Sequence, residues 1–306
     1  MPGSKMQSEP HRELPAIRDH RRQWKRCLYV YPVISRRAEG LSIGVNLNPA
    51  KDCNFSCLYC QIDRRVPRGL EEVNMSTLAE ELREAFRKID SGEIWRESRF
   101  AEVPQKLRRV NDIALSGDGE PTCLPNFDEA VAAAAAAKDE FCRDDVKIVT
   151  ITNASQLDQP QVQRALPILD SNNGEIWAKL DAGSEDFFQR VNRPQPRISL
   201  QRIVDSIISV AKARPVVIQS LFFLIDRAPP LREEIDAYCR RLSDIVDAGG
   251  KIKLVQIHTI ARSPQDSSAT ALADAELDRI ADTVRAIAPT PVEVYYGANV
   301  APQQQS

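Results

Sequence analysis

The chain has 306 residues, of which 41 are basic and 43 acidic, so its formal net charge is −2 at pH 7. With 42% hydrophobic and 27% charged residues, the composition is that of an ordinary soluble globular protein. No stretch approaches the ~18 consecutive apolar residues that a membrane helix needs. The polar, basic N-terminus lacks the apolar segment of a secretory signal, so we expect a cytoplasmic protein with no membrane partner.

The charge is unevenly distributed along the chain. Residues 1–70 carry 13 Lys and Arg against 6 Asp and Glu, a net charge of +7, and the other 236 residues carry 28 against 37, a net charge of −9. Such a basic head could contact phosphate, but we favour the simpler interpretation of a solvated terminal arm. We therefore expect a basic N-terminal extension at 1–40, one domain at 41–297 and a disordered tail at 298–306.

Apolar runs rich in Val and Ile alternate with segments of helical period. Strands are predicted at 42–48, 112–116, 146–152, 175–181, 216–224, 251–260 and 292–296. Helices are predicted at 77–90, 126–140, from 160 onward, and at 199–213, 232–248 and 275–288. The first helix would begin with a capping box formed by Thr77 and Glu80.

Strands separated by helices indicate βαβ units and a parallel sheet, which makes this an α/β protein. Six or seven units are too few for a closed eight-stranded barrel, so we predict a partial (β/α)6 TIM-like barrel, with a flat doubly wound sheet as the alternative. Polar residues at the carboxyl ends of the strands favour the barrel, because sites are built there. They are Asn46, Asn48, Ser116, Thr152, Asn153, Lys179, Asp181, Gln219, Gln256 and His258.

Three of the seven cysteines, Cys53, Cys57 and Cys60, lie within eight residues. A chain without an export signal is not expected to hold a disulfide framework, so the cluster indicates a metal site. The other four show no ligand spacing, and we expect buried, unreactive thiols; they are Cys27, Cys123, Cys142 and Cys239.

Thiolates favour zinc or an iron–sulfur cluster. Structural zinc takes four ligands, commonly as two pairs, and no second pair is present, although His258 is a possible fourth ligand. Three cysteines on one loop would instead hold three irons of a [4Fe–4S] cluster and leave the fourth iron open to a substrate or cofactor.

The segment from Cys53 to Cys60, with Tyr59 before the last cysteine, resembles the CxxxCxΦC signature of the radical SAM superfamily. The segment 116–122, SGDGEPT, resembles the glycine-rich loop that this family carries after its second strand. A dinucleotide-binding GxGxxG turn is the rival interpretation of that loop, but it fails because Thr122 stands where the third glycine is required. The resemblance extends over roughly residues 42–260 and implies a radical SAM core for the predicted domain.

The resemblance also implies ligands for S-adenosylmethionine. Gly117, Gly119 and Glu120 would bind its methionyl amino group, although Asp118 replaces the family's middle glycine. Lys179 suits the methionyl carboxylate as a point charge. The remaining implied contacts are Tyr59 beside the adenine, Asp181 or His258 at the ribose hydroxyls, and Asn153 after the third strand. An internal polar network, or simple packing for Tyr59, is the alternative for each.

The family's mechanism implies that a reduced [4Fe–4S] cluster cleaves S-adenosylmethionine to a 5′-deoxyadenosyl radical, which abstracts hydrogen from the substrate. A flavodoxin-like or ferredoxin-like protein would supply the electron, and no acid–base residue is assigned, since the cofactors carry the chemistry. Sequence segments such as SGDGEPT and VNRP resemble those of the branch that contains wyosine-type tRNA modification synthases and related Fe–S oxidoreductases. This resemblance implies that Asn192 and Arg193 face the substrate. The missing upstream cysteines and the net charge of −2 do not favour RNA, so the substrate stays open. A non-catalytic zinc-binding module is a further alternative.

Overall fold

The structure, a computed structural model, describes residues 15–19, 21–63, 73–288 and 290–297. The predicted tail at 298–306 and the first 14 residues of the predicted extension lie outside the described residues. Within the described ranges, no helix is both long enough and apolar enough to cross a membrane.

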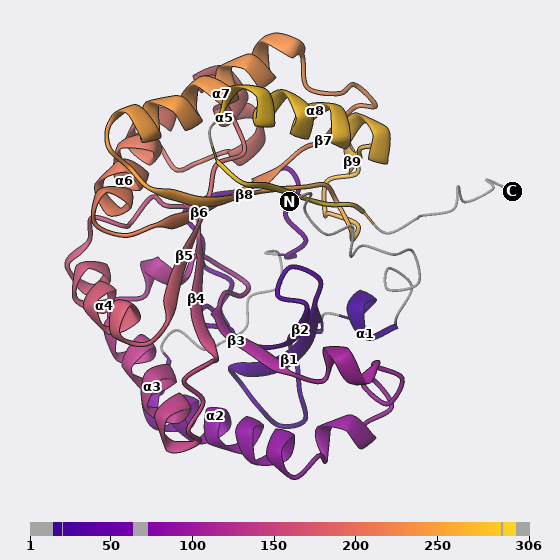
Figure 1. The fold of residues 1–306 in the computed structure, drawn as a ribbon, viewed down its shortest axis with the longest axis vertical. Helices are drawn as coiled ribbons and strands as arrows, with labels where there is room; N and C mark the ends of the chain where they lie inside the picture. The colour runs from indigo at the N-terminus through magenta and orange to yellow at the C-terminus, as the bar shows by residue number, and fades with distance from the viewer. Residues whose placement is uncertain (1–14, 20, 64–72, 289, 298–306) are drawn as a thin grey trace, which may run out of the picture.

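Eight strands form one curled sheet, shown in Figure 1, and their order in the sheet follows their order in the chain. They are β1 (Val30–Ser35), β2 (Gly40–Val45), β3 (Val110–Leu115), β4 (Lys147–Thr152), β5 (Gly174–Lys179), β6 (Val216–Leu221), β8 (Ile252–His258) and β10 (Val292–Tyr295). Only β1 runs antiparallel to its neighbour, and all other pairs are parallel. Two further strands, β7 (Phe223–Ile225) and β9 (Ala269–Ala271), form a separate antiparallel ribbon.

Helices cover the outer face of the curled sheet (Figure 1). They are α2 (Met75–Asp90), α3 (Phe127–Glu140), α4 (Pro160–Ser171), α5 (Glu185–Asn192), α6 (Leu200–Ala213), α7 (Arg232–Asp247) and α8 (Asp274–Ile287). A short α1 (Pro15–Arg18) and the 3-10 turns η2 (Ile94–Arg96), η3 (Gln105–Leu107) and η4 (Pro121–Cys123) complete the described elements. A doubly wound sheet would carry helices on both faces. The partial-barrel prediction is therefore confirmed, and the flat-sheet alternative is wrong.

The main core lies between the sheet and this outer layer of helices. On α2, Leu78, Leu82 and Phe86 recur at helical spacing and are fully buried. Side chains of this kind each stabilise the fold by about 1.5–3 kcal/mol when buried. The helix begins earlier than the predicted capping box, because the side chain of Asn74 accepts a hydrogen bond from the backbone N–H of Thr77 at 2.9 Å. Asn74 is as good a capping residue as Thr77, and the sequence alone did not rank them.

Two predictions about strands differ from the structure. No strand was predicted at 30–35, yet β1 pairs with β2 along its whole length and is almost entirely buried. Its continuous burial removes the alternation that marks a half-exposed strand, and Pro32 also argues against one. The predicted strand at 216–224 divides after Leu221, because Phe222 N–H donates to the carbonyl of His258 at 2.9 Å and the chain leaves the sheet.

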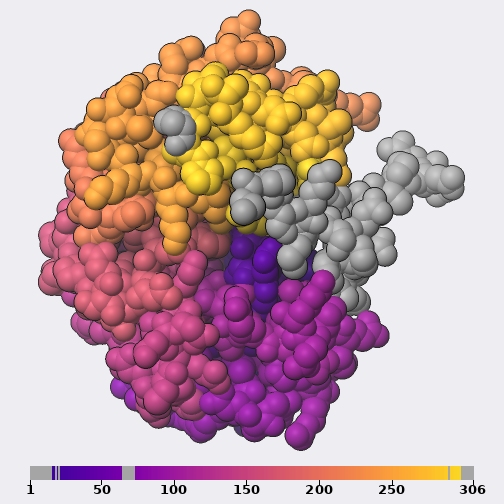
Figure 2. Space-filling model, in the orientation of Figure 1, coloured from indigo at the N-terminus to yellow at the C-terminus, as the bar shows by residue number. Residues whose placement is uncertain are grey.

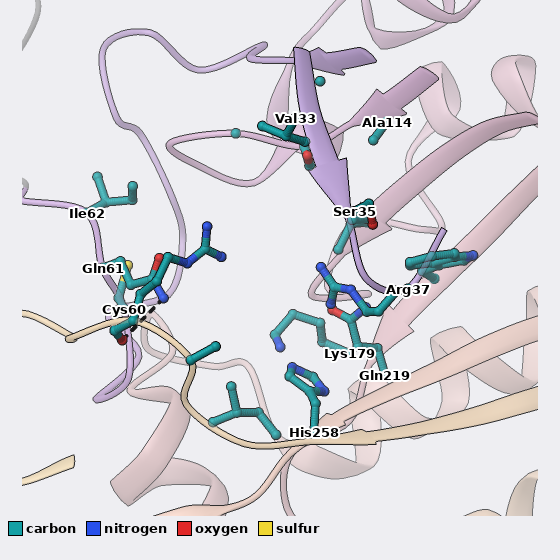
Figure 3. A pocket seen from close by; sticks show the side chains of 18 of the residues that line it. Val33, Ser35, Arg37, Cys60, Gln61, Ile62, Ala114, Lys179, Gln219 and His258 are labelled. Carbon is teal, nitrogen blue, oxygen red and sulfur yellow. Dashed lines mark hydrogen bonds between the residues drawn. The ribbon is translucent and has the colours of Figure 1, made fainter. Parts of the chain in front are cut away.

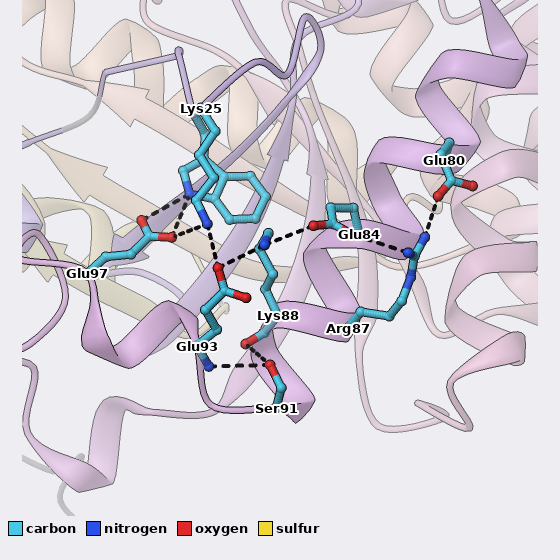
Figure 4. A network of polar contacts seen from close by, with 9 residues as sticks. Lys25, Glu80, Glu84, Arg87, Lys88, Ser91, Glu93 and Glu97 are labelled. Carbon is cyan, nitrogen blue, oxygen red and sulfur yellow. Dashed lines mark hydrogen bonds and ion pairs between the residues drawn. The ribbon is translucent and has the colours of Figure 1, made fainter.

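The described part of the N-terminal segment is packed against the domain, so its interpretation as a solvated arm is wrong there. Trp24 is only 3% exposed, and its indole N–H donates to Glu97 at 3.1 Å. Lys25 pairs with Glu93 at 2.9 Å and with Glu97 at 3.0 Å. Figure 4 shows these pairs continuing through Lys88 into the charged residues of α2. Exposed pairs stabilise little, so burial of the Trp24 ring is the main attachment.

The four isolated cysteines are not all buried. Cys239 is fully buried, as predicted, whereas Cys27 and Cys123 are half-buried. Cys142 is exposed, which makes the prediction wrong at that position. It follows the end of α3 in a left-handed turn conformation, and such turns lie at the surface.

Candidate active site

The loop that follows β2 carries the three clustered cysteines and is held by backbone hydrogen bonds from a distant segment. Ser56 and Leu58 N–H groups donate to the carbonyls of Arg193 and Val191 at 3.0 and 2.8 Å. On the other side, Gln265 N–H donates to the carbonyl of Cys60 at 2.9 Å. The end of α5 and the segment after β8 therefore position the cysteine loop from two directions.

Cys53, Cys57 and Cys60 line one cavity of about 350 Å³, within the range of about 300–1,000 Å³ for ligand sites. The cavity also collects most of the other predicted site residues, namely Tyr59, Gly117, Gly119, Glu120, Asn153, Lys179 and His258. Figure 3 shows Lys179 and His258 facing Cys60 across open space. Figure 2 shows a hollow between the magenta and yellow parts of the surface, with the indigo N-terminal residues recessed in it. Asp181 is absent from the described residues that line the cavity.

The sulfur of Cys57 lies among polar hydrogens. Burial raises the pKa of this thiol to about 12, although the nearby hydroxyl of Tyr59 opposes that shift. The Nδ2 group of Asn192 lies 3.8 Å from the same sulfur. A metal bound here would remove the thiol proton, and the Asn192 amide would then stabilise the thiolate.

The glycine-rich segment packs directly on the chain that leads into the cysteine loop. A Cβ at Gly119 would lie 1.7 Å from the carbonyl oxygen of Asp52, and a Cβ at Gly117 would lie 2.3 Å from Oδ1 of Asn46. Close backbone approach therefore accounts for both glycines without reference to a ligand. The role predicted for them at S-adenosylmethionine remains a prediction.

Glu120 is buried and almost fully hydrogen-bonded. Its Oε1 accepts from the Thr122 hydroxyl at 2.5 Å and the Thr152 hydroxyl at 2.6 Å, and Oε2 accepts from the Asn153 backbone N–H at 2.7 Å. Burial raises the pKa of this carboxyl, while these donors oppose the shift. A carboxylate offers about four acceptor positions, so Oε2 has room for one more donor from the cavity.

Asp118, the residue that departs from the family's glycine, forms an ion pair with the N-terminal segment. Its Oδ1 accepts from Arg22 at 2.5 Å, and its Oδ2 accepts from Asn46 Nδ2 at 2.9 Å. Both Arg22 and Asp118 line the cavity. The basic segment before β1 therefore contributes a side chain to the site, which the sequence analysis did not anticipate.

Lys179 and Asp181 lie together at the end of β5. The Nζ of Lys179 is 3.4 Å from Asp181 Oδ1 and 5.0 Å from the centre of the Tyr59 ring. The Asp181 carboxylate also accepts from the Tyr59 hydroxyl, from Leu221 N–H at 2.9 Å and from Asn192 Nδ2 at 3.2 Å. Asp181 thus holds Lys179 and Tyr59 in place from behind.

His258 and Asn153 differ in how much of their polar surface is in use. Burial lowers the pKa of His258 well below its usual value, so the ring is neutral, and its buried Nδ1 has no partner among the described residues. Asn153 Nδ2 donates to Asn54 at 2.8 Å, and its Oδ1 accepts from the Ser155 hydroxyl at 2.6 Å. Among the described residues, a ring nitrogen of His258 therefore lacks a hydrogen-bond partner, whereas both polar atoms of the Asn153 side chain are hydrogen-bonded.

A family model described as the radical SAM superfamily matches residues 47–226, more than half of the chain. This chain belongs to the radical SAM superfamily.

Within the residues that the structure describes, no three His, Cys, Asp or Glu side chains converge closely enough to bind a single metal ion.

Several curated proteins are similar to this radical SAM chain. It is 28% identical over 250 residues to a protein named GTPase Obg from Brachyspira hyodysenteriae, covering 81% of this chain and 32% of that protein. It is also 28% identical over 184 residues to the UPF0026 protein MJ1312 of Methanocaldococcus jannaschii, covering 58% of this chain and 48% of the relative. The chain thus matches 32% and 48% of the length of these two relatives.

Two solved structures share the fold. A radical SAM methyltransferase from Sphaerobacter thermophilus superposes with a TM-score of 0.61 at 14% identity, over 89% of this chain and 70% of the other. SuiB from Streptococcus suis, bound to S-adenosylmethionine, superposes with a TM-score of 0.55 at 14% identity, over 85% and 52%. These identities are low, and the likeness establishes the fold alone.

Proposed function

We propose that this radical SAM chain is an enzyme in which Cys53, Cys57 and Cys60 hold a [4Fe–4S] cluster. The single observation that supports this most strongly is that one cavity is lined by all three thiols and by the glycine-rich segment. When bound, such a cluster supplies the electron for reductive cleavage of S-adenosylmethionine and hence for hydrogen abstraction from a substrate. A flavodoxin-like or ferredoxin-like protein is the proposed electron donor.

The donor set of the cavity fits these cofactors. The free acceptor position on Glu120 suits the methionyl ammonium, and the ammonium of Lys179 suits the methionyl carboxylate. The unpartnered Nδ1 of His258 suits a ribose hydroxyl. Asp181 lies behind the cavity lining, so we propose that it positions Lys179 and Tyr59 instead of contacting the ribose.

The cavity also has the apolar surface that radical chemistry requires. Val149, Ile151 and Trp177 line it together with the polar residues. Exclusion of water by such side chains protects a reactive intermediate from side reactions. The chain's own residues would thus orient the cofactor at one end and enclose the substrate at the other.

The proposal is tested with protein purified without oxygen and reconstituted with iron and sulfide. We expect about four irons and four sulfides per chain, and formation of 5′-deoxyadenosine from S-adenosylmethionine once the protein is reduced with dithionite. Single Ser substitutions at Cys53, Cys57 or Cys60 should abolish both results. Cys142→Ser is the matched control, because that thiol is exposed and is distant in sequence from the loop.

Two outcomes would overturn the proposal. One is a complete, reducible cluster that produces no 5′-deoxyadenosine. The other is one zinc per chain without sulfide in protein purified anaerobically, which would instead favour the non-catalytic zinc-binding module.

A further inference from the structure

Four arginines from three distant parts of the chain line the cavity, in addition to Lys179. Arg22 precedes β1, Arg36 and Arg37 form the turn between β1 and β2, and Arg262 follows β8. All four line the same cavity of about 350 Å³, and burial together with the neighbouring charges of Arg22, Arg37 and Arg36 lowers the pKa of Arg262 to about 10. Like charges repel strongly in a partly buried cavity, so this arrangement favours binding of an anion.

Two of these guanidinium groups are not neutralised by the described part of the chain. Arg22 pairs with Asp118, and Arg36 donates to the carbonyl of Tyr296. Among the described residues, by contrast, neither Arg37 nor Arg262 has a carboxylate within the 4.0 Å of an ion pair.

Arg37 makes a cation–π contact with an aromatic ring. Its guanidinium lies over the ring of Trp177 on β5, 5.7 Å from the ring centre. Figure 3 places Arg37 beside Lys179 and Gln219, across the cavity from Cys60. The carboxylate of Asp112 acts on Arg37 only through its charge, and it accepts a hydrogen bond from the buried Ser42 hydroxyl. The N–H donors of Arg37, which lie in the plane of the guanidinium, therefore have no carboxylate partner among the described residues, and Arg37 lines the cavity.

The proposed cofactors do not neutralise these arginines. S-adenosylmethionine has a single carboxylate, which the proposed function assigns to Lys179, and its sulfonium and ammonium make it a net cation. The cluster with three thiolates is anionic, and the segment that carries Arg262 lies beside the cysteine loop, so the cluster offsets part, but not all, of the positive charge of the four arginines and Lys179. The surplus positive charge thus faces the space that a substrate would fill.

We propose that the substrate is a small molecule bearing a phosphate group, which Arg37 and Arg262 bind inside the barrel. A phosphate monoester carries about −1.5 to −2 charges at pH 7 and three strong acceptor oxygens. It therefore matches two guanidinium groups, whereas a single carboxylate is satisfied by one bidentate arginine. The cavity volume of about 350 Å³ favours a small molecule over the backbone of a folded RNA. This inference rests on the proposed function only in identifying the bound anion as the substrate.

The test measures phosphate binding directly and does not require an active cluster. The full chain is titrated with inorganic phosphate at constant ionic strength, with chloride as the balancing ion, while tryptophan fluorescence is recorded. Because Arg37 lies over Trp177, we expect a saturable change that Trp177→Phe abolishes. Equilibrium dialysis with radioactive phosphate measures the affinity independently of the fluorescence signal.

Matched variants decide whether the arginines are responsible. Arg37→Gln and Arg262→Gln should each weaken phosphate binding at least tenfold. Arg279→Gln, an exposed arginine on α8, should leave it unchanged. Circular dichroism of each variant verifies that it is folded, so that lost binding is not mistaken for unfolding.

Three outcomes would overturn the inference. The first is a linear, unsaturable response, or an equal affinity for phosphate and chloride. The second is displacement of phosphate by free methionine, which would assign the arginines to the methionyl carboxylate. The third is an oligoribonucleotide that binds through these arginines while inorganic phosphate does not. Failure to cleave S-adenosylmethionine would contradict the proposed function and leave the binding result intact.

Discussion

The contact between Gly119 and Asp52 makes Gly119→Ala a sharp perturbation of the site. The new methyl group would lie 1.7 Å from the Asp52 carbonyl oxygen and 2.7 Å from Cβ of Asn48. Contacts between such atoms below 3.0 Å essentially do not occur, so the two loops must separate by about 1.3 Å. Separation of that size also breaks the 3.2 Å hydrogen bond from Glu120 N–H to the Asp52 carbonyl.

The expected cost follows from these two losses. Overpacking costs about 1–3 kcal/mol, and one lost hydrogen bond about 1 kcal/mol, so we expect the free energy of unfolding to fall by about 2–4 kcal/mol. The displaced residue, Asp52, directly precedes Cys53, and a misplacement of ~1 Å in a site can reduce a reaction rate about 10²-fold. Iron and sulfide content after reconstitution should therefore fall together with the yield of 5′-deoxyadenosine. Urea unfolding measures the stability of the same preparations.

Gly249→Ala is the control for a glycine substitution that disturbs no contact. Gly249 has φ +87°, and a Cβ there would have no atom within 4 Å. Its left-handed backbone should cost about 1–2 kcal/mol without any effect on cluster content. If Gly119→Ala kept wild-type stability and a full cluster, close approach of the two loops would not be what requires glycine there.

Two further predictions concern charges around the cavity. Burial raises the pKa of Asp112 from 3.8 to about 6. The contribution of this group to the free energy of unfolding is therefore fully present below pH 3.8 and is lost as the pH rises through about 6. Asp112→Asn, which can still accept from Ser42, should be more stable than the parent at pH 7 by about 3 kcal/mol and equal to it near pH 3.8; urea unfolding at both pH values checks this, and a pH-independent difference would contradict it. Arg22→Met should lower the free energy of unfolding by about 1.5–3 kcal/mol, because it leaves Asp118 buried without its charged donor. Adding Asp118→Asn should recover part of that loss in the same unfolding assay, and strictly additive costs would show that the two side chains are not coupled.

The cysteine loop and the order of the elements were predictable because both are local features of the chain. Three thiols within eight residues need no knowledge of the fold, and α2 is marked by apolar residues at helical spacing. The strand ends were partly informative: period-two alternation predicts Lys179 with Asp181, and Gln256 with His258, on shared strand faces, and of these four Lys179 and His258 line the cavity. Period-two alternation predicts side-chain direction only within a strand. Because β5 ends at Lys179, it did not hold for Asp181, which lies behind the cavity lining.

The arginines of the cavity were not predictable by the same reasoning. Arg22, Arg37 and Arg262 are separated by up to 240 residues and meet only through the curl of the sheet. The excess of positive charge in residues 1–70 was a real signal, but charge counts do not distinguish a solvated arm from a segment that enters a site. The missed strand β1 was decisive, because Arg36 and Arg37 follow directly after it.

The same sheet serves stability on one face and ligand binding on the other. Along β3, Ile113 and Leu115 are fully buried in the main core, while Asp112 and Ala114, at the alternate positions, line the cavity. The interior of a closed (β/α) barrel is normally filled by branched apolar side chains. Here β6 places Gln219 in the cavity, hydrogen-bonded to Gln256 at 3.1 Å. Polar side chains thus share the interior with the apolar cluster of Val149, Trp177 and Val217, and what the cavity binds can determine which polar residues stand there.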